Sequence, residues 1–225
     1  MTQDWRSVRG EAASLVILGT SAHSKVVGDI ASQSGYRVLG YIGDGEALEL
    51  CDTDKALNGV KTFGELVAKE PETMLALGIG DNKLREKLFL RYSADFPRVN
   101  WPVLVDPSAL LKPGVKLGQG TVVCPLAFVG LDTLVGVGCL LNTRSSVDHD
   151  SELGDFCSMA PSSATGGTVS IGKRSFVGVG VSIRDGIRIG DDVIVGAGAA
   201  VVKDLDQAGT YVGVPAKSMR REKEV

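Results

Sequence analysis

Apolar residues recur at every sixth position along the second half of this 225-residue chain. Sixteen of seventeen successive positions hold an aliphatic residue or Met, and the other holds Thr165. Period six matches neither an amphipathic helix nor an alternating strand, so it predicts a short strand and a turn, repeated. The positions are Val105, Leu111, Leu117, Val123, Val129, Val135, Leu141, Val147, Leu153, Met159, Thr165, Ile171, Val177, Ile183, Ile189, Val195 and Val201.

The residues that follow these positions support the same interpretation. Glycine comes directly after nine of the seventeen, and small or branched residues stand four places after them. Glycine gives the backbone freedom that turns need, and small residues fit inside a narrow coil. Three six-residue units would make one triangular coil of a parallel β-helix, so residues eighteen apart should stack at about 4.8 Å.

Residues 15–104 follow a different pattern, in which short apolar runs alternate with helical spacing. Alternating strands and helices predict a small, Rossmann-like parallel α/β sheet, which binds ligands at the carboxyl ends of its strands. We expect strands at 15–19, 36–42 and 73–80, helices at 23–33, 63–69 and 82–92, and a connection at 99–105 that leads into the first coil.

These patterns divide the chain into four parts. We expect a flexible tail at 1–14, an α/β domain at 15–104, a β-helix at 105–206 and a C-terminal tail at 207–225. A solenoid must hide its open ends, so the charged C-terminal stretch would cap or leave one end.

The charge balance limits the choice of partners. The net charge is −3 and the pI is about 5.5, which argues against nucleic acid or an anionic membrane as a partner. No segment approaches the ~20 apolar residues needed to span a bilayer. The polar N-terminus lacks the apolar core of a signal peptide, so we expect a cytoplasmic protein.

The four cysteines form no CxxC pair and have no nearby histidine, so they predict neither a metal site nor a disulfide framework. Cys139 and Cys157 stand eighteen residues apart, and we interpret them as stacked fillers of the β-helix interior.

The first loop of the α/β domain is a candidate nucleotide site. Gly19 opens a loop that contains His23 and leads to a helix N-terminus, where free backbone amides can hold phosphate. Asp44 follows the second strand, near the usual place of a ribose contact. The loop lacks the full G-x-G-x-x-G pattern, so a helper domain with a tight glycine turn is the alternative.

His149 is the candidate general base. Asp148 and Asp150 flank it, and a carboxylate can fix the imidazole tautomer and stabilise the protonated ring. Gly167 stands eighteen residues later, one coil beyond, where a bare backbone leaves room for a thioester and its N–H could receive an oxyanion. The alternative is a surface histidine placed among acids for solubility.

With these residues in view, the chain resembles the hexapeptide-repeat sugar acetyltransferases of the sialic-acid O-acetyltransferase and bacillosamine-pathway N-acetyltransferase type. The resemblance covers about residues 15–217 and implies an α/β domain followed by a left-handed parallel β-helix. It rests on GTSAHSKVVGDI, LGIGDNKLREKL, LNTRSSVDHD, IVGAGAAVVKD and YVGVPAK, which look like family motifs in family order.

The resemblance implies a role for several residues. His149 would be the general base, paired with Asp150, and Asn142 would help to hold the acceptor or the base. Acetyl-CoA would be the co-substrate, with no metal, in a cleft between subunits of a homotrimer. Its contacts would be Gly166, Gly167, Val179, Ala197 and Lys203. The nucleotide-linked amino sugar would be held by Gly19, His23, Asp44, Asp81 and Asn82.

The chain departs from the family pattern at two places. Ser21 and Ala22 replace the usual glycine pair of the first loop. Ser158 stands where many members carry a second histidine near the acetyl group.

Together these features predict an acetyl-CoA-dependent enzyme that acetylates the C4 amine of a nucleotide-linked 4-amino-deoxy sugar. One alternative is O-acetylation of sialic acid or a related sugar hydroxyl, which would leave the nucleotide pocket unexplained. Another is a non-catalytic β-helix scaffold that senses a nucleotide and does not bind coenzyme A.

Overall fold

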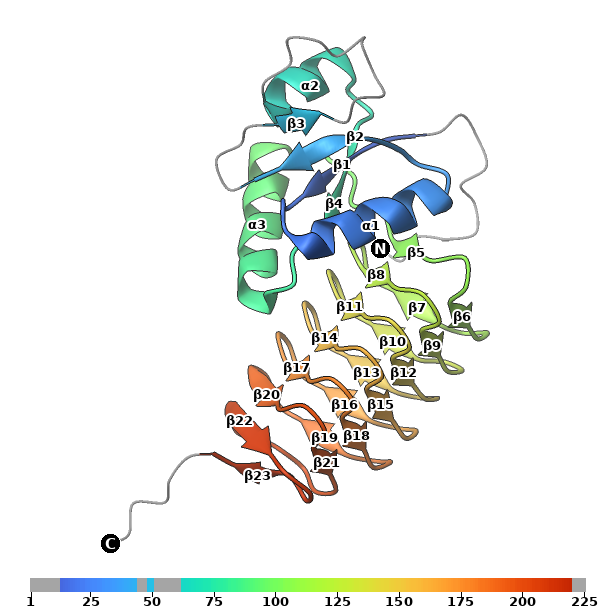
Figure 1. The fold of residues 1–225 in the computed structure, drawn as a ribbon, viewed down its shortest axis with the longest axis vertical. Helices are drawn as coiled ribbons and strands as arrows, with labels where there is room; N and C mark the ends of the chain where they lie inside the picture. The colour runs from blue at the N-terminus through green and yellow to red at the C-terminus, as the bar shows by residue number, and fades with distance from the viewer. Residues whose placement is uncertain (1–12, 44–47, 51–61, 220–225) are drawn as a thin grey trace, which may run out of the picture.

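The computed structural model describes residues 13–43, 48–50 and 62–219. A small α/β domain sits on one end of a left-handed parallel β-helix, and α3 reaches from that domain down one edge of the β-helix (Figure 1). No helix in the described ranges is long and apolar enough to cross a membrane.

The described part of the α/β domain contains one four-stranded sheet in the order β3-β2-β1-β4. Its strands are β1 (Ser14–Leu18), β2 (Arg37–Ile42), β3 (Leu48–Leu50) and β4 (Met74–Leu77). The pairs β1–β2 and β1–β4 are parallel, as predicted, but the edge strand β3 is antiparallel to β2. The apolar pattern did not indicate β3, because three residues are too short for a visible period.

Within the described ranges, three helices accompany the sheet: α1 (Ala22–Gln33), α2 (Phe63–Lys69) and α3 (Asn82–Asp95). Val27 and Ile30 of α1 are buried, whereas Val26 is 40% exposed. Side chains of Thr62 and Asp81 cap α2 and α3 by accepting backbone N–H groups of Glu65 and Leu84.

The β-helix has three sheets, and between residues 104 and 201 residues eighteen apart pair in parallel, for example Leu134 with Glu152 and Val147 with Val129. The predicted coil length is therefore confirmed. One sheet contains β7 (Lys116–Leu117), β10 (Leu134–Val135), β13 (Glu152–Leu153), β16 (Ser170–Ile171) and β19 (Arg188–Ile189). A second contains β6 (Leu110–Leu111), β9 (Phe128–Val129), β12 (Ser146–Val147), β15 (Ala164–Thr165), β18 (Ser182–Ile183) and β21 (Ala200–Val201).

The third sheet continues past the predicted end of the β-helix at residue 206. It contains β5 (Leu104–Val105), β8 (Val122–Val123), β11 (Leu140–Leu141), β14 (Ser158–Met159), β17 (Phe176–Val177), β20 (Val193–Val195), β22 (Gly209–Val212) and β23 (Lys217–Ser218). β22 is parallel to β20 and β23 is antiparallel to β22, so the expected tail instead covers the open edge of this sheet.

The residues of the six-residue pattern form the core of the β-helix, where Val123, Leu141, Val177 and Val195 are fully buried. Cys139 and Cys157 stack inside it, with 3.8 Å between their Sγ atoms, and both are free thiols. Their interpretation as interior fillers is confirmed.

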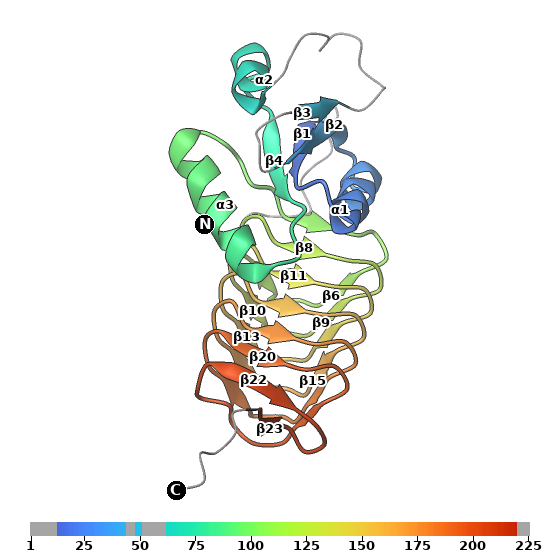
Figure 2. The ribbon, with the colours of Figure 1, turned by 60° about the vertical axis from the view of Figure 1, so that its left-hand side comes forward.

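Turns connect the three sheets at three corners of the β-helix, and we name each corner after a residue or element that lies there. The helix corner contains Gly120, Gly138, Phe156, Arg174 and Asp192, between the five-stranded and eight-stranded sheets. It lies next to α3, which is bonded to Gly138 and Phe156 through Arg85. Figure 2 shows α3 from a second side. The histidine corner contains Leu131, His149, Gly167 and Asp185, between the six-stranded and five-stranded sheets. The valine corner contains Thr143, Pro161, Val179 and Ala197, between the eight-stranded and six-stranded sheets.

An aromatic cluster holds the two parts of the molecule together. Phe89 of α3 packs between Trp101 and Phe156, at ring-centroid distances of 4.8 and 5.4 Å. Gly120 and Gly138 at the helix corner keep positive φ angles and lie against Leu77 of the α/β domain. A side chain at either glycine would push the domain away from the β-helix.

Candidate active site

His149 and Gly167 lie directly against each other at the histidine corner. A Cβ atom built on Gly167 would lie 2.6 Å from His149 Nε2, so only glycine leaves room for the ring. The backbone continues the contact, because Thr168 N–H donates to His149 O at 2.8 Å. The stacking predicted from the eighteen-residue period is therefore present.

Asp150 orients the imidazole. Its Oδ2 lies 2.8 Å from His149 Nδ1, and both side chains are more than half exposed. The hydrogen bond with Asp150 raises the pKa of His149; burial opposes this, and the negative charges of Asp148 and Asp150 add to it. When Nδ1 carries the proton toward Asp150, Nε2 has its lone pair free on the side of Gly167, as a general base requires.

Thr165, the one polar residue in the six-residue pattern, has a structural role. Its hydroxyl accepts the backbone N–H of Asp148 at 3.1 Å, one residue before His149. The apolar period is therefore broken where an inward side chain fixes the turn that carries the imidazole.

Gly167 also supplies a donor. Among the described residues, its backbone N–H has no hydrogen-bond acceptor, whereas Gly166 N–H donates to Ile183 O. A vacant backbone donor beside a general base can receive the oxygen of a tetrahedral intermediate.

The other residues expected near the acetyl group divide between two corners of one chain. Lys203 follows β21 at the histidine corner, two coils beyond Gly167, and is exposed. Val179 and Ala197 are exposed at the valine corner, where Asn142 also lies. Asn142 Oδ1 accepts the N–H of Thr143, and one strand of the six-stranded sheet separates it from His149.

A cavity of about 310 Å³ opens at the carboxyl ends of β1, β2 and β4, where parallel sheets bind ligands. Gly19 and Asp81 line it, as the nucleotide prediction requires. A Cβ atom at Gly19 would lie 2.6 Å from Gly78 O, so glycine lets the two loops approach each other. The lining residues are Gly19, Thr20, Ser21, Ile42, Gly43, Gly78, Ile79, Gly80, Asp81, Leu84 and Leu88.

Two residues expected at the nucleotide do not line this cavity, and a third lies outside the described residues. His23 does not line the cavity, and its Nε2 is buried without a hydrogen-bond partner among the described residues. Burial, and then the charge of Arg85, lower the pKa of His23, which favours a neutral ring. Asn82 is buried under the cavity, and Asp44 lies outside the described residues, directly after Gly43 in the sequence.

Arg85 is the main polar residue that the sequence patterns did not indicate. It is 2% exposed and lies between the cavity and the helix corner. It lies on the buried face of α3 with Asn82, Leu88 and Tyr92. The spacing of three to four residues between them is the one feature of the sequence that could have indicated the burial of Arg85. Ser158 accepts a hydrogen bond from Arg85 and donates one to Asn82, on a different corner from His149.

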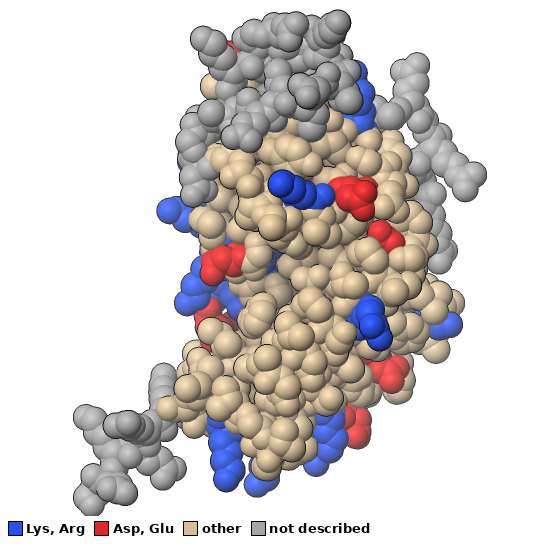
Figure 3. All heavy atoms as spheres, viewed as in Figure 1, with Lys and Arg blue, Asp and Glu red and all other residues tan. Residues whose placement is uncertain are grey.

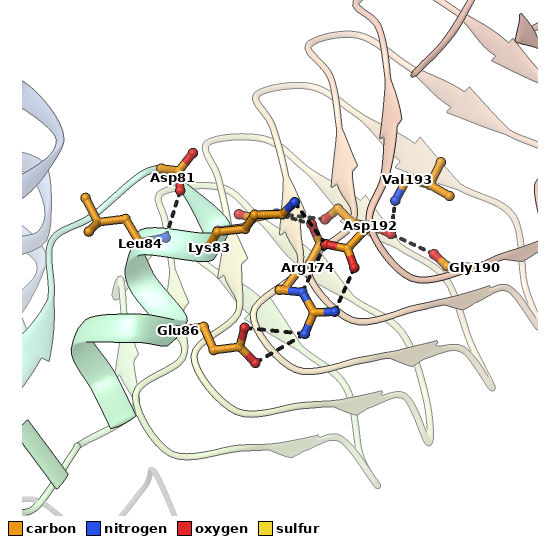
Figure 4. Close-up of polar contacts among 10 residues, drawn as sticks. Asp81, Lys83, Leu84, Glu86, Arg174, Gly190, Asp192 and Val193 are labelled. Atoms are coloured by element: carbon orange, nitrogen blue, oxygen red, sulfur yellow. Dashed lines mark hydrogen bonds and ion pairs between the residues drawn. The ribbon is translucent and has the colours of Figure 1, made fainter. Parts of the chain in front are cut away.

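Charged side chains form a second contact between α3 and the helix corner (Figure 4). Arg174 pairs with Asp192 at 2.7 Å and with Glu86 at 3.3 Å, and Lys83 lies 3.6 Å from Asp192. On the face in Figure 3, Lys and Arg side chains are interspersed with Asp and Glu, which is unlike the basic surface that nucleic acid requires. No group of three or more metal-binding side chains occurs within the described ranges.

The comparisons with known proteins agree with this arrangement. Residues 14–92 match the family model of the PglD N-terminal domain, and residues 168–203 match that of the hexapeptide repeat of succinyl-transferase. A GDP-perosamine N-acetyltransferase of Escherichia coli O157:H7 is 30% identical over 121 residues, which are 54% of its length. The chain therefore spans about half of this curated relative.

Solved structures match over nearly the whole chain. PerB from Caulobacter crescentus, in complex with CoA and GDP-perosamine, has a TM-score of 0.79 and 36% identity. The match covers 92% of this chain and 97% of that one. The acetyltransferase domain of PglB from Neisseria gonorrhoeae FA1090, in complex with acetyl coenzyme A, is 28% identical with a TM-score of 0.79, over 92% of this chain and all of that one. This chain belongs to the hexapeptide-repeat sugar N-acetyltransferases of the bacillosamine-pathway and perosamine type.

Proposed function

We propose that the protein transfers an acetyl group from acetyl-CoA to the C4 amine of a nucleotide-linked 4-amino-deoxy sugar. The observation that carries this proposal is the pairing of His149 with Asp150 against the bare backbone of Gly167. The cavity at the end of the α/β sheet supplies a place for the nucleotide. Relatives named for CoA and GDP-perosamine support both assignments.

The reaction is a direct attack. The amine nitrogen forms a bond with the carbonyl carbon of the acetyl thioester, and Gly167 N–H receives the negative oxygen of the tetrahedral intermediate. His149 Nε2 accepts the proton that the amine loses. The carbon–sulfur bond then breaks, the amide remains on the sugar, and the imidazolium returns the proton to the departing thiolate.

We further propose that the active protein is a homotrimer, with coenzyme A bound between neighbouring β-helices. Within one chain, His149 and Gly167 lie at the histidine corner, whereas Val179 and Ala197 lie at the valine corner. A cleft lined by all four needs the histidine corner of one copy and the valine corner of the next. The exposed Val179 side chain, 52% accessible in the single chain, suits such a cleft. We expect the trimer to act in the cytoplasm, where acetyl-CoA is made.

The test is release of the coenzyme A thiol across a panel of UDP-, GDP- and TDP-linked 4-amino sugars, with sialic acid included. We expect thiol release with at least one nucleotide-linked amine. His149→Ala should lower kcat by about 10²–10⁴-fold, the usual value of general-base help, with an unchanged circular dichroism spectrum. Turnover near that of the wild type in this variant would remove His149 from the chemistry, and release with sialic acid alone would favour O-acetylation.

A further inference from the structure

Arg85 connects the wall of the nucleotide cavity to the coil that carries His149. Its Nη1 donates to Ile79 O at 3.0 Å and Gly80 O at 3.1 Å, and both residues line the cavity. Its Nε donates to Gly138 O at 2.7 Å, and its Nη2 donates to Phe156 O at 2.9 Å, both at the helix corner. One guanidinium group therefore holds the cavity loop and the β-helix together.

The same group is held by a second layer of polar contacts. Arg85 Nη2 also donates to Asn82 Oδ1 at 2.9 Å and to Ser158 Oγ at 3.0 Å. The Asn82 amide nitrogen donates to Arg174 O at 2.9 Å and Ser175 O at 3.0 Å, one coil further along. Three successive coils are thus bonded to the first turn of α3.

These hydrogen bonds are more than the packing of the α/β domain on the β-helix alone requires. No carboxylate forms an ion pair with Arg85 within the described ranges, and its charge is stabilised by carbonyl, amide and hydroxyl oxygens. Burying a charge without a counter-ion is costly, and the aromatic cluster beside it already supplies apolar contact. The planar fork of an arginine fixes orientation as well as distance, which a point charge cannot do.

We propose that Arg85 is a positioning residue for the acceptor: it sets where the nucleotide cavity presents the sugar amine relative to the acetyl group. Phe156 and Ser158 belong to the same coil as His149, joined to it through the short strand β13. An error in the angle of the cavity loop would therefore displace the amine from its line of attack. The proposal rests on the proposed function.

The experiment compares Arg85→Lys with Arg174→Gln. Both changes weaken the contact between α3 and the helix corner, but Arg174 touches neither the cavity nor its loop. Kinetics are measured with a nucleotide-linked amino sugar and with a small free amine that does not use the cavity, per mole of folded protein.

For Arg85→Lys we expect kcat with the nucleotide-linked sugar to fall about 10²-fold, as for a reacting group displaced by about 1 Å, with little change in KM. Transfer to the free amine and all kinetics of Arg174→Gln should match the wild type. An unchanged kcat, an equal loss with both acceptors, or an effect on KM alone would overturn the proposal. Absence of transfer to any nucleotide-linked amine by the wild type would instead refute the proposed function itself.

Ser158→Ala keeps the proposal testable if Arg85→Lys does not fold. It removes one acceptor of the guanidinium and leaves the backbone carbonyls in place. We expect kcat with the nucleotide-linked sugar to fall by about two- to tenfold, which corresponds to the loss of one buried hydrogen bond, with no effect on the free amine. Kinetics equal to the wild type with both acceptors would contradict the role of Arg85.

Discussion

At the scale of single residues, the proposed chemistry depends on which protonation state His149 holds. The sequence predicted that Gly167 would lie against His149, because one coil length relates residues 149 and 167, whereas the role of His149 as a base stays a prediction. It could not predict that Arg85 and Asn82 would be buried together. Both are polar residues of an amphipathic helix, and only the position of α3 against the β-helix directs them inward.

Replacement of Asp150 should move the pH dependence of the reaction. The hydrogen bond with Asp150 raises the pKa of His149, so the neutral ring that acts as base appears only as pH rises through that higher value. In Asp150→Asn the acidic limb of the kcat/KM profile should shift to lower pH, and the plateau should fall because the ring loses its orienting partner. Asn suits the positive φ of 54° at this position. An acidic limb at the same pH as in the wild type would contradict the assignment.

At the scale of secondary-structure elements, the six-residue period gave the strands of the β-helix and their register, because every coil repeats the same inward and outward pattern. The helices of the α/β domain were predicted within a few residues from a different signal, the helical spacing of their apolar residues. The pattern did not indicate β3 or the pair β22 and β23. These strands are short, and they form by pairing with the edges of sheets that already exist. Their presence is a consequence of the tertiary fold.

The ion pairs between α3 and the helix corner should stabilise the protein in a salt-dependent way. Arg174→Gln removes the contacts with Asp192 and Glu86, and we expect the free energy of unfolding to fall by about 0.5–1 kcal/mol at low salt. The difference should shrink at high salt, because solvent screens exposed charges. It should also shrink in acid, because Arg174 holds the pKa of Asp192 low and the pair is lost as pH falls through that value.

Urea denaturation at two salt concentrations measures this effect. Lys83→Gln is the matched control, since its single contact with Asp192 is longer, at 3.6 Å, and more exposed. A loss that is independent of salt would indicate that Arg174 acts through packing of its stem.

At the scale of the whole molecule, the proposed site needs two copies of the chain, and complementation tests this. His149→Ala disables the histidine corner, and Ala197→Arg obstructs the exposed valine corner, so each variant alone should be inactive. When the two are unfolded together and refolded, mixed trimers contain sites with an intact histidine corner from one variant and an intact valine corner from the other. We expect thiol release to recover to a fraction of the wild-type rate. No recovery, in mixtures that form trimers by light scattering, would indicate that each site lies within one chain.

The most direct test of the central claim is to locate the transferred acetyl group. The protein is incubated with acetyl-CoA labelled with ¹³C at the carbonyl and with a nucleotide-linked 4-amino sugar, and the product is examined by NMR. We predict an amide carbonyl coupled to the nitrogen at C4 of the sugar, formed by the wild type about 10²–10⁴-fold faster than by His149→Ala. An ester on a sugar hydroxyl, or the same amide formed equally fast without His149, would contradict the account.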